Sequence, residues 1–253
     1  MNRVDSLMPM MTTEILTRGY ELDGTRTIPP AVLIRYMEWG RWEFLNSEQN
    51  TFRHAINSLV VAAQSLVVLA PVVERINLEI SVWLSRVGNT SLDISQMIVD
   101  KESKMAIALG RATLVNVDSR RRPKVVAETV KDFIDTSPAN FDGRLFPKIQ
   151  NSLPIESVKS IERRVMPSEI DLLKHVNHSR YVDYVEDARK LLFPEQAEMR
   201  DPIFGLTLEY KTEALNGQLL TIDVSPLKSQ AAFQSQIRHG QDIVANAIVQ
   251  LTQ

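Results

Sequence analysis

DLLKHVNHSRYVDYVEDAR, the segment Asp171–Arg189, decides the fold because the chain contains an altered copy of it. The segment Asp23–Arg41 reads DGTRTIPPAVLIRYMEWGR, and both fit the pattern D-x12-Y-x-E-x-(G/A)-R, with 148 positions between corresponding residues. Self-similarity at a fixed period is the signature of a repeated structural unit. The paired residues are Asp23/Asp171, Tyr36/Tyr184, Glu38/Glu186, Gly40/Ala188 and Arg41/Arg189.

A second match follows each of these segments in the same order. Ala70–Ile80 (APVVERINLEI) aligns without gaps to Ala214–Val224 (ALNGQLLTIDV) at an offset of 144 positions. A four-residue deletion in the second copy would account for the smaller offset. Two matches in the same order indicate two copies of one fold unit in tandem.

Each copy has the same predicted order of elements. A short leading strand carries an Asp near its end, and a helix follows, over Val32–Leu45 in the first copy and about Ser179–Phe193 in the second. The Val-rich run Leu59–Val73 is expected to form a pair of buried strands. Alternating apolar and polar runs predict further antiparallel strands over Leu78–Leu84, Ser91–Val99, Ala106–Val117, Gly205–Tyr210, Leu219–Val224, Ala232–Ile237 and Ile243–Leu251.

A helix followed by a run of antiparallel strands predicts an α+β unit whose sheet can wrap the helix. We therefore predict an N-terminal repeat over residues 10–130 and a C-terminal repeat over residues 159–253. Pro, Asn and Gly residues mark the segment 131–158 between them as a linker.

Composition excludes several function classes. The 253 residues are 44% hydrophobic, enough for a substantial core, and the formal net charge of −2 provides no general basic field for nucleic acid. The chain has no cysteine, which excludes disulfides, a Cys nucleophile and thiolate metal sites. No other metal-ligand spacing or phosphate-binding loop is present, so we expect no metal and no cofactor. With no signal peptide and no apolar run long enough to span a bilayer, the expected location is cytoplasmic.

The residues HVNHSRYVDYVEDAR, preceded by Asp171, resemble the start of the helix in hotdog-fold thioesterases. The tandem layout narrows this likeness to the plant-type and bacterial acyl-acyl carrier protein (acyl-ACP) thioesterases, which carry two hotdog repeats with the active site in the second. Leu114–Val125 and Leu208–Ala214 also resemble strand motifs of that family. The resemblance implies a double-hotdog thioesterase, monomeric or homodimeric, whose substrate is an acyl or aryl thioester of ACP or coenzyme A.

The resemblance also places the catalytic residues of the family on positions of this chain. Its Asp falls on Asp171, its His on His175 and its Glu on Glu213. The family has an Asn two residues after the Asp, and this chain has Leu173 there, a departure that affects how water or the thioester carbonyl is positioned. His178 matches a His of the small single-hotdog acyl-CoA thioesterases.

These residue types suit thioester hydrolysis. A carboxylate such as Asp171 can act as nucleophile or general base, and a His can orient water or protonate the leaving thiolate. The first N–H groups of the helix, about Asn177 to Arg180, are expected to lack intrahelical partners, so they could hydrogen-bond the thioester oxygen. Structural alternatives are a turn-capping role for Asp171 and an N-cap role for Asn177. We include Asn177 among the candidate catalytic residues with Asp171, His175, His178 and Glu213.

The first copy is an internal control because it lacks most of these polar residues. Shared positions such as Asp23, Tyr36 and Arg41 are predicted to be fold determinants. Asp171 stays the leading catalytic candidate, with the weakness that its counterpart Asp23 is retained in a copy without catalytic partners. Glu186 and Arg189 are predicted to form an i, i+3 pair on one helix face. The candidates His175, Asn177, His178 and Glu213 correspond to Thr27, Pro29, Pro30 and Leu69.

Two further functions remain open at this stage. Because of Leu173, the chain could be a non-hydrolytic acyl-thioester-binding protein or a chain-release partner in a biosynthetic pathway. A hotdog dehydratase or isomerase is less favoured, because the pattern around the catalytic His of those enzymes is absent. The basic cluster Arg120, Arg121, Arg122 and Lys124 could meet an acidic carrier protein, although a solvated turn is the preferred interpretation.

Overall fold

The structure, a computed structural model, describes residues 10–47, 58–134, 143–150, 153, 157–194, 203–227 and 231–251. The described residues fall into two compact units. The first unit lies within Met1–Ile28, Leu33–Gln64 and Leu69–Gly143, and the second lies within Pro29–Val32, Ser65–Val68 and Arg144–Gln253. Each unit consists mainly of antiparallel strands and contains one long helix.

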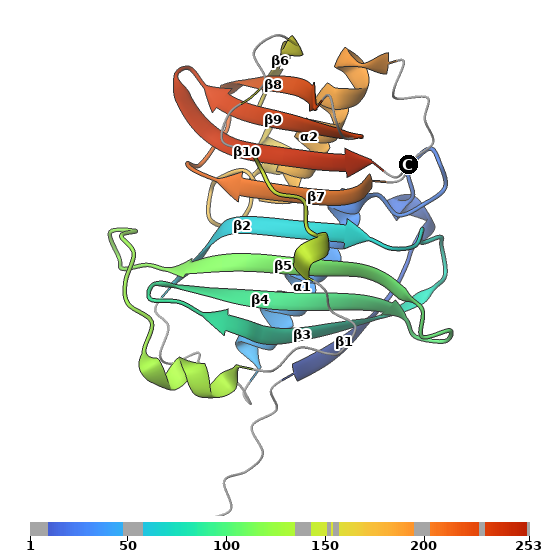
Figure 1. Cartoon of the computed structure of the whole chain (residues 1–253), viewed down its shortest axis with the longest axis vertical. Helices are drawn as coiled ribbons and strands as arrows, with labels where there is room; N and C mark the ends of the chain where they lie inside the picture. Colours follow the sequence, from blue (N-terminus) through green and yellow to red (C-terminus); the bar gives the residue numbers. More distant parts are fainter. Residues whose placement is uncertain are drawn as a thin grey trace, which may run out of the picture. The chain divides into compact units, whose positions relative to one another are not determined.

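The strands of the first unit follow the order β1-β3-β4-β5-β2 in the sheet (Figure 1). The strand β1 lies at the edge and pairs antiparallel with β3. The core includes the fully buried side chains of Leu33, Met37 and Trp83. The elements are β1 (Met10–Leu16), α1 (Pro30–Asn46), β2 (Leu59–Val68), β3 (Asn77–Val87), β4 (Ser91–Asp100) and β5 (Ala106–Asn116).

The second unit repeats this order, with β6-β8-β9-β10-β7 in the sheet. A short 3-10 helix precedes the long helix in both units, at Gly19–Glu21 in the first and at Pro167–Glu169 in the second. The core includes the buried side chains of Tyr184, Leu208 and Val249. The elements are β6 (Lys159–Arg164), α2 (Arg180–Leu192), β7 (Ile203–Tyr210), β8 (Leu219–Leu227), β9 (Ala232–His239) and β10 (Asp242–Leu251).

The predicted helices and the later strands are confirmed to within a few residues. The prediction of a strand pair over Leu59–Val73 is wrong, because the run forms the single strand β2. No Gly, Pro, Asn or Asp interrupts the run before Pro71, so the residues that favour a reversal most strongly are absent from it. Of the predicted linker, residues 135–142, 151–152 and 154–156 lie outside the described residues.

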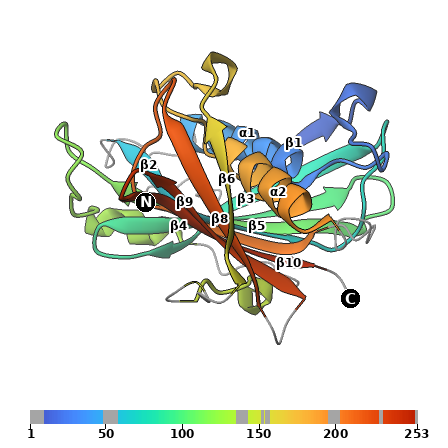
Figure 2. The same ribbon diagram turned by 90° about the horizontal axis from the view of Figure 1, so that it is seen from above.

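The helix of each unit packs against strands of its own unit. At Gly40 of α1, an added Cβ would lie only 3.1 Å from Ile80 Cγ2 and 3.3 Å from Val82 Cγ2, so the helix backbone approaches β3 closely. The corresponding residue of α2 is Ala188, which is buried, and α2 contacts β6 and β8 (Figure 2). A small residue at this position therefore lets each helix lie near its sheet.

The strand register corrects the alignment of the second repeated segment. Met11 pairs with Val82 in the first unit, and its equivalent Lys159 pairs with Val224 in the second, which gives an offset of 142 instead of 144. Side chains alternate between the two faces of a strand, so a shift by two residues preserves the apolar pattern and is invisible in the sequence. Glu213 therefore corresponds to Pro71 instead of Leu69.

The turn before β3 and the turn before β8 confirm this offset. Arg75 N–H donates to Thr17 O at 3.2 Å, and Gly217 N–H donates to Val165 O at 3.1 Å. Arg75 and Gly217 both have left-handed backbone, with φ of 63° and 78°. Each unit thus contains the equivalent hydrogen bond and the same turn conformation, in addition to the same order of elements.

Candidate functional site

The candidate site begins in a tight turn between the 3-10 helix and α2. Asp171 N–H donates to His175 O at 2.9 Å, and Lys174 N–H donates to Asp171 O at 3.0 Å. Lys174 has a φ of 68°, which closes the turn. The carboxylate atom Oδ1 of Asp171 accepts Leu173 N–H at 2.8 Å, and this places Asp171 Oδ2 3.5 Å from His175 Nδ1.

The first unit contains the same turn without the histidine. Asp23 N–H donates to Thr27 O at 2.9 Å, and Arg26, the equivalent of Lys174, has a φ of 64°. Asp23 Oδ1 accepts Thr25 N–H at 2.8 Å and the Thr25 hydroxyl at 2.6 Å. The retained Asp is therefore explained by the turn that it caps in both units, as the turn-capping interpretation predicted.

Glu213 reaches the site from the segment that follows β7. Val176 N–H donates to Ala214 O at 2.9 Å, which ties this segment to the residue next to His175. Glu213 Oε1 then lies 3.9 Å from His175 Nε2. The side chains of Asp171, His175 and Glu213 are 21%, 20% and 42% exposed, so all three are in contact with solvent.

Asn177 organises the start of α2. Its Oδ1 accepts both the N–H of Ser179, at 2.9 Å, and the hydroxyl of Ser179, at 2.6 Å. These bonds form an Asx turn just before the helix, and the residue at the N-cap of α2 is Ser179, so the N-cap role predicted for Asn177 is wrong. The predicted catalytic role of Asn177 remains a prediction.

His178 lies beside Tyr210 of β7. Its carbonyl oxygen accepts the Tyr210 hydroxyl at 3.0 Å, and the two rings are perpendicular, with centroids 6.3 Å apart. These contacts hold the backbone of His178 at the start of the helix. His178 is thus close to His175 in the sequence, and its position is determined by contacts with Tyr210.

The expectation that Asn177 to Arg180 offer unpartnered N–H groups is wrong for most of the segment. Asn177 N–H donates to Glu169 O at 2.9 Å, and Arg180 N–H donates to Asn177 O at 2.9 Å. The Ser179 N–H donates to the Asn177 side chain. The hydrogen bonds of the turn before the helix already use these three N–H groups, so they are unavailable to a thioester oxygen.

Residues 153–252 match the family model of the acyl-ACP thioesterase C-terminal domain. This part of the chain is similar to that family. The matched range contains every residue of the candidate site and most of the second unit. On this match the chain is a thioester hydrolase, and the matched range, here called the thioesterase domain, lies in the second unit.

The fold likeness extends beyond the thioesterase domain to the whole chain. A crystal structure of an acyl-ACP thioesterase from Bacteroides thetaiotaomicron matches with a TM-score of 0.77 at 16% identity, over 96% of this chain and 98% of that one. A 12:0-ACP thioesterase from Umbellularia californica matches with a TM-score of 0.78 at 16% identity, over 99% and 96%. No curated protein matches the sequence. At this identity the structures show a shared fold.

Sequence reasoning missed a buried carboxylate in the thioesterase domain. Glu169 Oε2 accepts the Tyr184 hydroxyl at 2.7 Å, and the Arg163 guanidinium donates to the other carboxylate oxygen. Burial alone would raise the pKa of Glu169, but hydrogen bonds from Met166 N–H, Tyr184 and Arg163 outweigh burial and hold that pKa below its ordinary value. The Tyr36 hydroxyl donates to Glu21 in the same way at 2.6 Å. The recurrence of Glu at the repeat offset was the signal that could have found this pair.

The predicted pair of Glu186 and Arg189 is confirmed. Arg189 Nε and Nη2 donate to Glu186 Oε1 and Oε2 at 2.9 and 3.0 Å. Both residues are buried in the thioesterase domain. The pair therefore supports the helix and does not join the candidate site.

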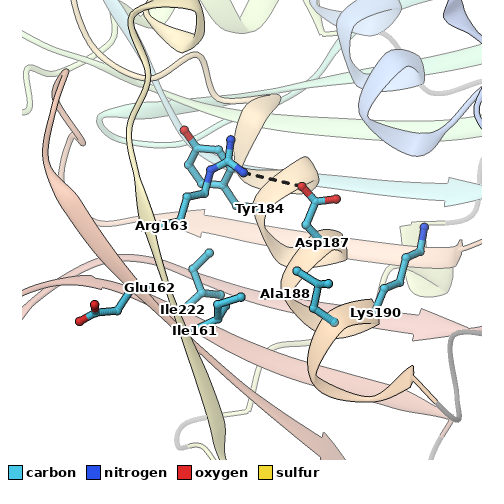
Figure 3. A pocket seen from close by; sticks show the side chains of 9 residues that line it. Ile161, Glu162, Arg163, Tyr184, Asp187, Ala188, Lys190 and Ile222 are labelled. Carbon is cyan, nitrogen blue, oxygen red and sulfur yellow. Dashed lines mark ion pairs between the residues drawn. The ribbon is translucent and has the colours of Figure 1, made fainter.

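A groove of about 360 Å³ lies between β6 and α2 (Figure 3). Arg163 and Asp187 point toward one another in this groove, with 3.7 Å between Nη1 and Oδ2. The Arg163 guanidinium also stacks over the Tyr184 ring, 4.1 Å from its centroid. The positive charge is thus balanced within the domain, and the groove contains none of Asp171, His175 and Glu213.

The basic cluster near residue 120 forms an exposed turn around Asp118. Asp118 Oδ1 accepts the N–H groups of Arg120 and Arg122 at 2.8 and 2.9 Å, and the Arg122 side chain binds Oδ2. These hydrogen bonds, the one from Arg122 N–H first, hold the pKa of Asp118 below its ordinary value. The geometry agrees with the preferred interpretation, a solvated turn.

Among the described residues, no helix is long and apolar enough to cross a membrane.

Proposed function

We propose that the chain is a double-hotdog thioesterase that hydrolyses an acyl thioester of ACP or coenzyme A at Asp171, His175 and Glu213. The single observation that carries the proposal is the position of His175 between two carboxylates, 3.5 Å from Asp171 and 3.9 Å from Glu213. This arrangement occurs in the domain that matches the acyl-ACP thioesterase family. Repetition of the element order in both units supports the double-hotdog fold.

The neighbours of His175 define the tautomer that the mechanism uses. Both groups near Nδ1, the Val176 carbonyl at 3.2 Å and the Asp171 carboxylate at 3.5 Å, are acceptors. The proton of the neutral ring therefore resides on Nδ1, and Nε2 keeps a lone pair toward Glu213. A gap of 3.9 Å between Nε2 and the Glu213 carboxylate suits a bridging water that donates to both groups.

Hydrolysis follows from this arrangement. The bridging water attacks the thioester carbonyl carbon, and its proton passes to His175 Nε2. The carbon–sulfur bond then breaks, and the proton on Nε2 passes to the leaving thiolate, so the products are a carboxylic acid and a thiol. Asp171 stabilises the charged imidazole in between. In the alternative route, Asp171 Oδ2 attacks the carbonyl carbon, the carbon–sulfur bond breaks and the thiolate leaves. Water then hydrolyses the resulting anhydride, which regenerates the Asp171 carboxylate, forms the carboxylic acid and supplies the proton of the thiol.

A thioester panel that varies acyl chain and carrier, read by release of free thiol, tests the function. We expect turnover on at least one acyl-ACP or acyl-CoA, and a fall of at least about tenfold in Asp171→Asn. Asp23→Asn is the matched control, because it changes the same turn in the first unit and should retain activity. Full activity of Asp171→Asn would refute the assigned site.

The same panel distinguishes hydrolysis from binding alone. Leu173, in place of the Asn of the family, is the observation behind a non-hydrolytic role. Tight binding of acyl-ACP with no thiol release from any member of the panel would favour an acyl-thioester-binding or chain-release partner and would overturn the hydrolase proposal.

A further inference from the structure

Tyr181 in the first turn of α2 carries a buried hydroxyl beside the candidate site. The residue is 3% exposed, and its ring lies 5.4 Å from the Tyr210 ring and 5.7 Å from the Tyr184 ring, centroid to centroid. A buried tyrosine hydroxyl normally has a hydrogen-bond partner. Here the partner is the backbone of Ala214, whose N–H donates to the Tyr181 oxygen at 3.3 Å.

This bond completes the attachment of Ala214. The Ala214 carbonyl already accepts Val176 N–H at 2.9 Å, so both backbone groups of Ala214 are held. Val176 directly follows His175, and Ala214 directly follows Glu213. The two hydrogen bonds therefore connect the backbone segments that carry the two side chains of the 3.9 Å His175–Glu213 contact.

The first unit shows that the fold does not need the tyrosine. The equivalent of Tyr181 is Leu33, which is buried and has no polar side-chain atom. Ile28 N–H donates to Val72 O at 2.7 Å, so the bond that corresponds to Val176–Ala214 is retained. The hydrogen bond from Ala214 N–H to the Tyr181 hydroxyl is therefore present in the unit that contains His175 and Glu213. Leu33 cannot accept the corresponding hydrogen bond in the first unit.

We infer that Tyr181 is a positioning residue, whose hydroxyl holds Glu213 against His175 through the backbone of Ala214. The inference rests on the proposed function, because it assigns a role within the same site. Burial, together with the nearby negative charge of Asp171, raises the pKa of Tyr181 to about 12, so the hydroxyl stays neutral at the pH of catalysis. The role is thus one of hydrogen bonding and geometry.

Tyr181→Phe is the test, because it removes the hydroxyl and keeps the ring. We expect kcat on the best thioester to fall about tenfold with KM within about twofold, since Glu213 is displaced without loss of substrate contacts. Amide hydrogen exchange of Ala214 should accelerate by at least about fivefold, while that of Val176 stays within twofold. Tyr36→Phe is the matched control, because it removes a tyrosine hydroxyl bound to Glu21 in the first unit and should leave kcat unchanged.

The outcomes separate this inference from the proposed function. Wild-type kcat and unchanged Ala214 exchange in Tyr181→Phe would overturn the inference even if the enzyme is active. If the wild type releases no thiol from any substrate, the proposed function fails, and the Ala214 exchange rate decides whether Tyr181 holds this segment. Should Tyr181→Phe fail to fold, Tyr181→Leu installs the residue of the first unit and is judged by the same two measurements.

Discussion

His175 directs Nδ1 toward Asp171, with 3.5 Å to Oδ2, while the turn that Asp171 caps determines where the histidine lies. The carboxylate thus has two tasks, because Oδ1 accepts Leu173 N–H and Oδ2 faces the imidazole. In the first unit the equivalent Asp23 performs the capping task alone, next to Thr27. The second unit therefore has a histidine at the end of a turn that both units form.

His175→Gln tests the imidazole as the proton carrier. The glutamine retains polar atoms but cannot transfer a proton near neutral pH, so kcat should fall at least about a hundredfold. Thiol release under saturating substrate measures the effect. His239→Gln, an exposed histidine at the end of β9, is the control and should retain full activity. A loss of less than threefold in His175→Gln would exclude the imidazole as general base.

Leu173→Thr tests whether the activity requires an Asp171 carboxylate that accepts few hydrogen bonds. Thr25, the equivalent residue of the first unit, donates its hydroxyl to Asp23 Oδ1 at 2.6 Å, and leucine cannot do so. A threonine at 173 should stabilise the Asp171 carboxylate and make it a poorer nucleophile and a weaker partner for His175. We expect kcat to fall about threefold to tenfold. Leu172→Thr is the control, because the Leu172 side chain is 99% exposed; equal activity of the two variants would contradict this account.

Glu169→Gln tests the buried carboxylate beneath α2. Its pKa is held below the ordinary value of 4.5, so the ionised form stabilises the folded state above pH 4.5, and this contribution is lost as the pH falls through the folded-state pKa. The free energy of unfolding of the variant should be about 2 kcal/mol lower than that of the wild type at pH 7. The difference should narrow below pH 4.5, as measured by urea unfolding between pH 3 and 7. The exposed Glu162→Gln should match the wild type, and a constant difference at every pH would contradict the assignment.

Glu186→Ala tests the buried ion pair of α2. Without its carboxylate partner, the Arg189 guanidinium remains in a site where it is 3% exposed, and the free energy of unfolding should fall by about 3 kcal/mol. Asp183→Ala breaks a half-buried pair with Arg180 on the same helix and should cost about 1 kcal/mol or less. Thermal unfolding of both variants gives the comparison. A similar loss of unfolding free energy in the two variants would show that burial does not increase the cost of removing one partner of the ion pair.

The sequence by itself determined the repeat, the two helices and most strands, because helical spacing and strand alternation are local patterns. It also brought Asp171 and His175 together, since four residues in one turn cannot lie far apart. The capping role of Asp171 and the pair Glu186–Arg189 followed from the same short-range geometry.

The tertiary structure decided what depends on register and on contacts between distant segments. The offset of 142 became visible only from the pairing of β1 with β3 and β6 with β8, because a shift by two residues leaves the strand pattern unchanged. The hydrogen bonds of Glu169 with Tyr184 and of Tyr181 with Ala214 join elements that no local pattern connects. Glu213 reaches His175 for the same reason: 38 residues of chain separate them, and the bond between Val176 and Ala214 closes that distance.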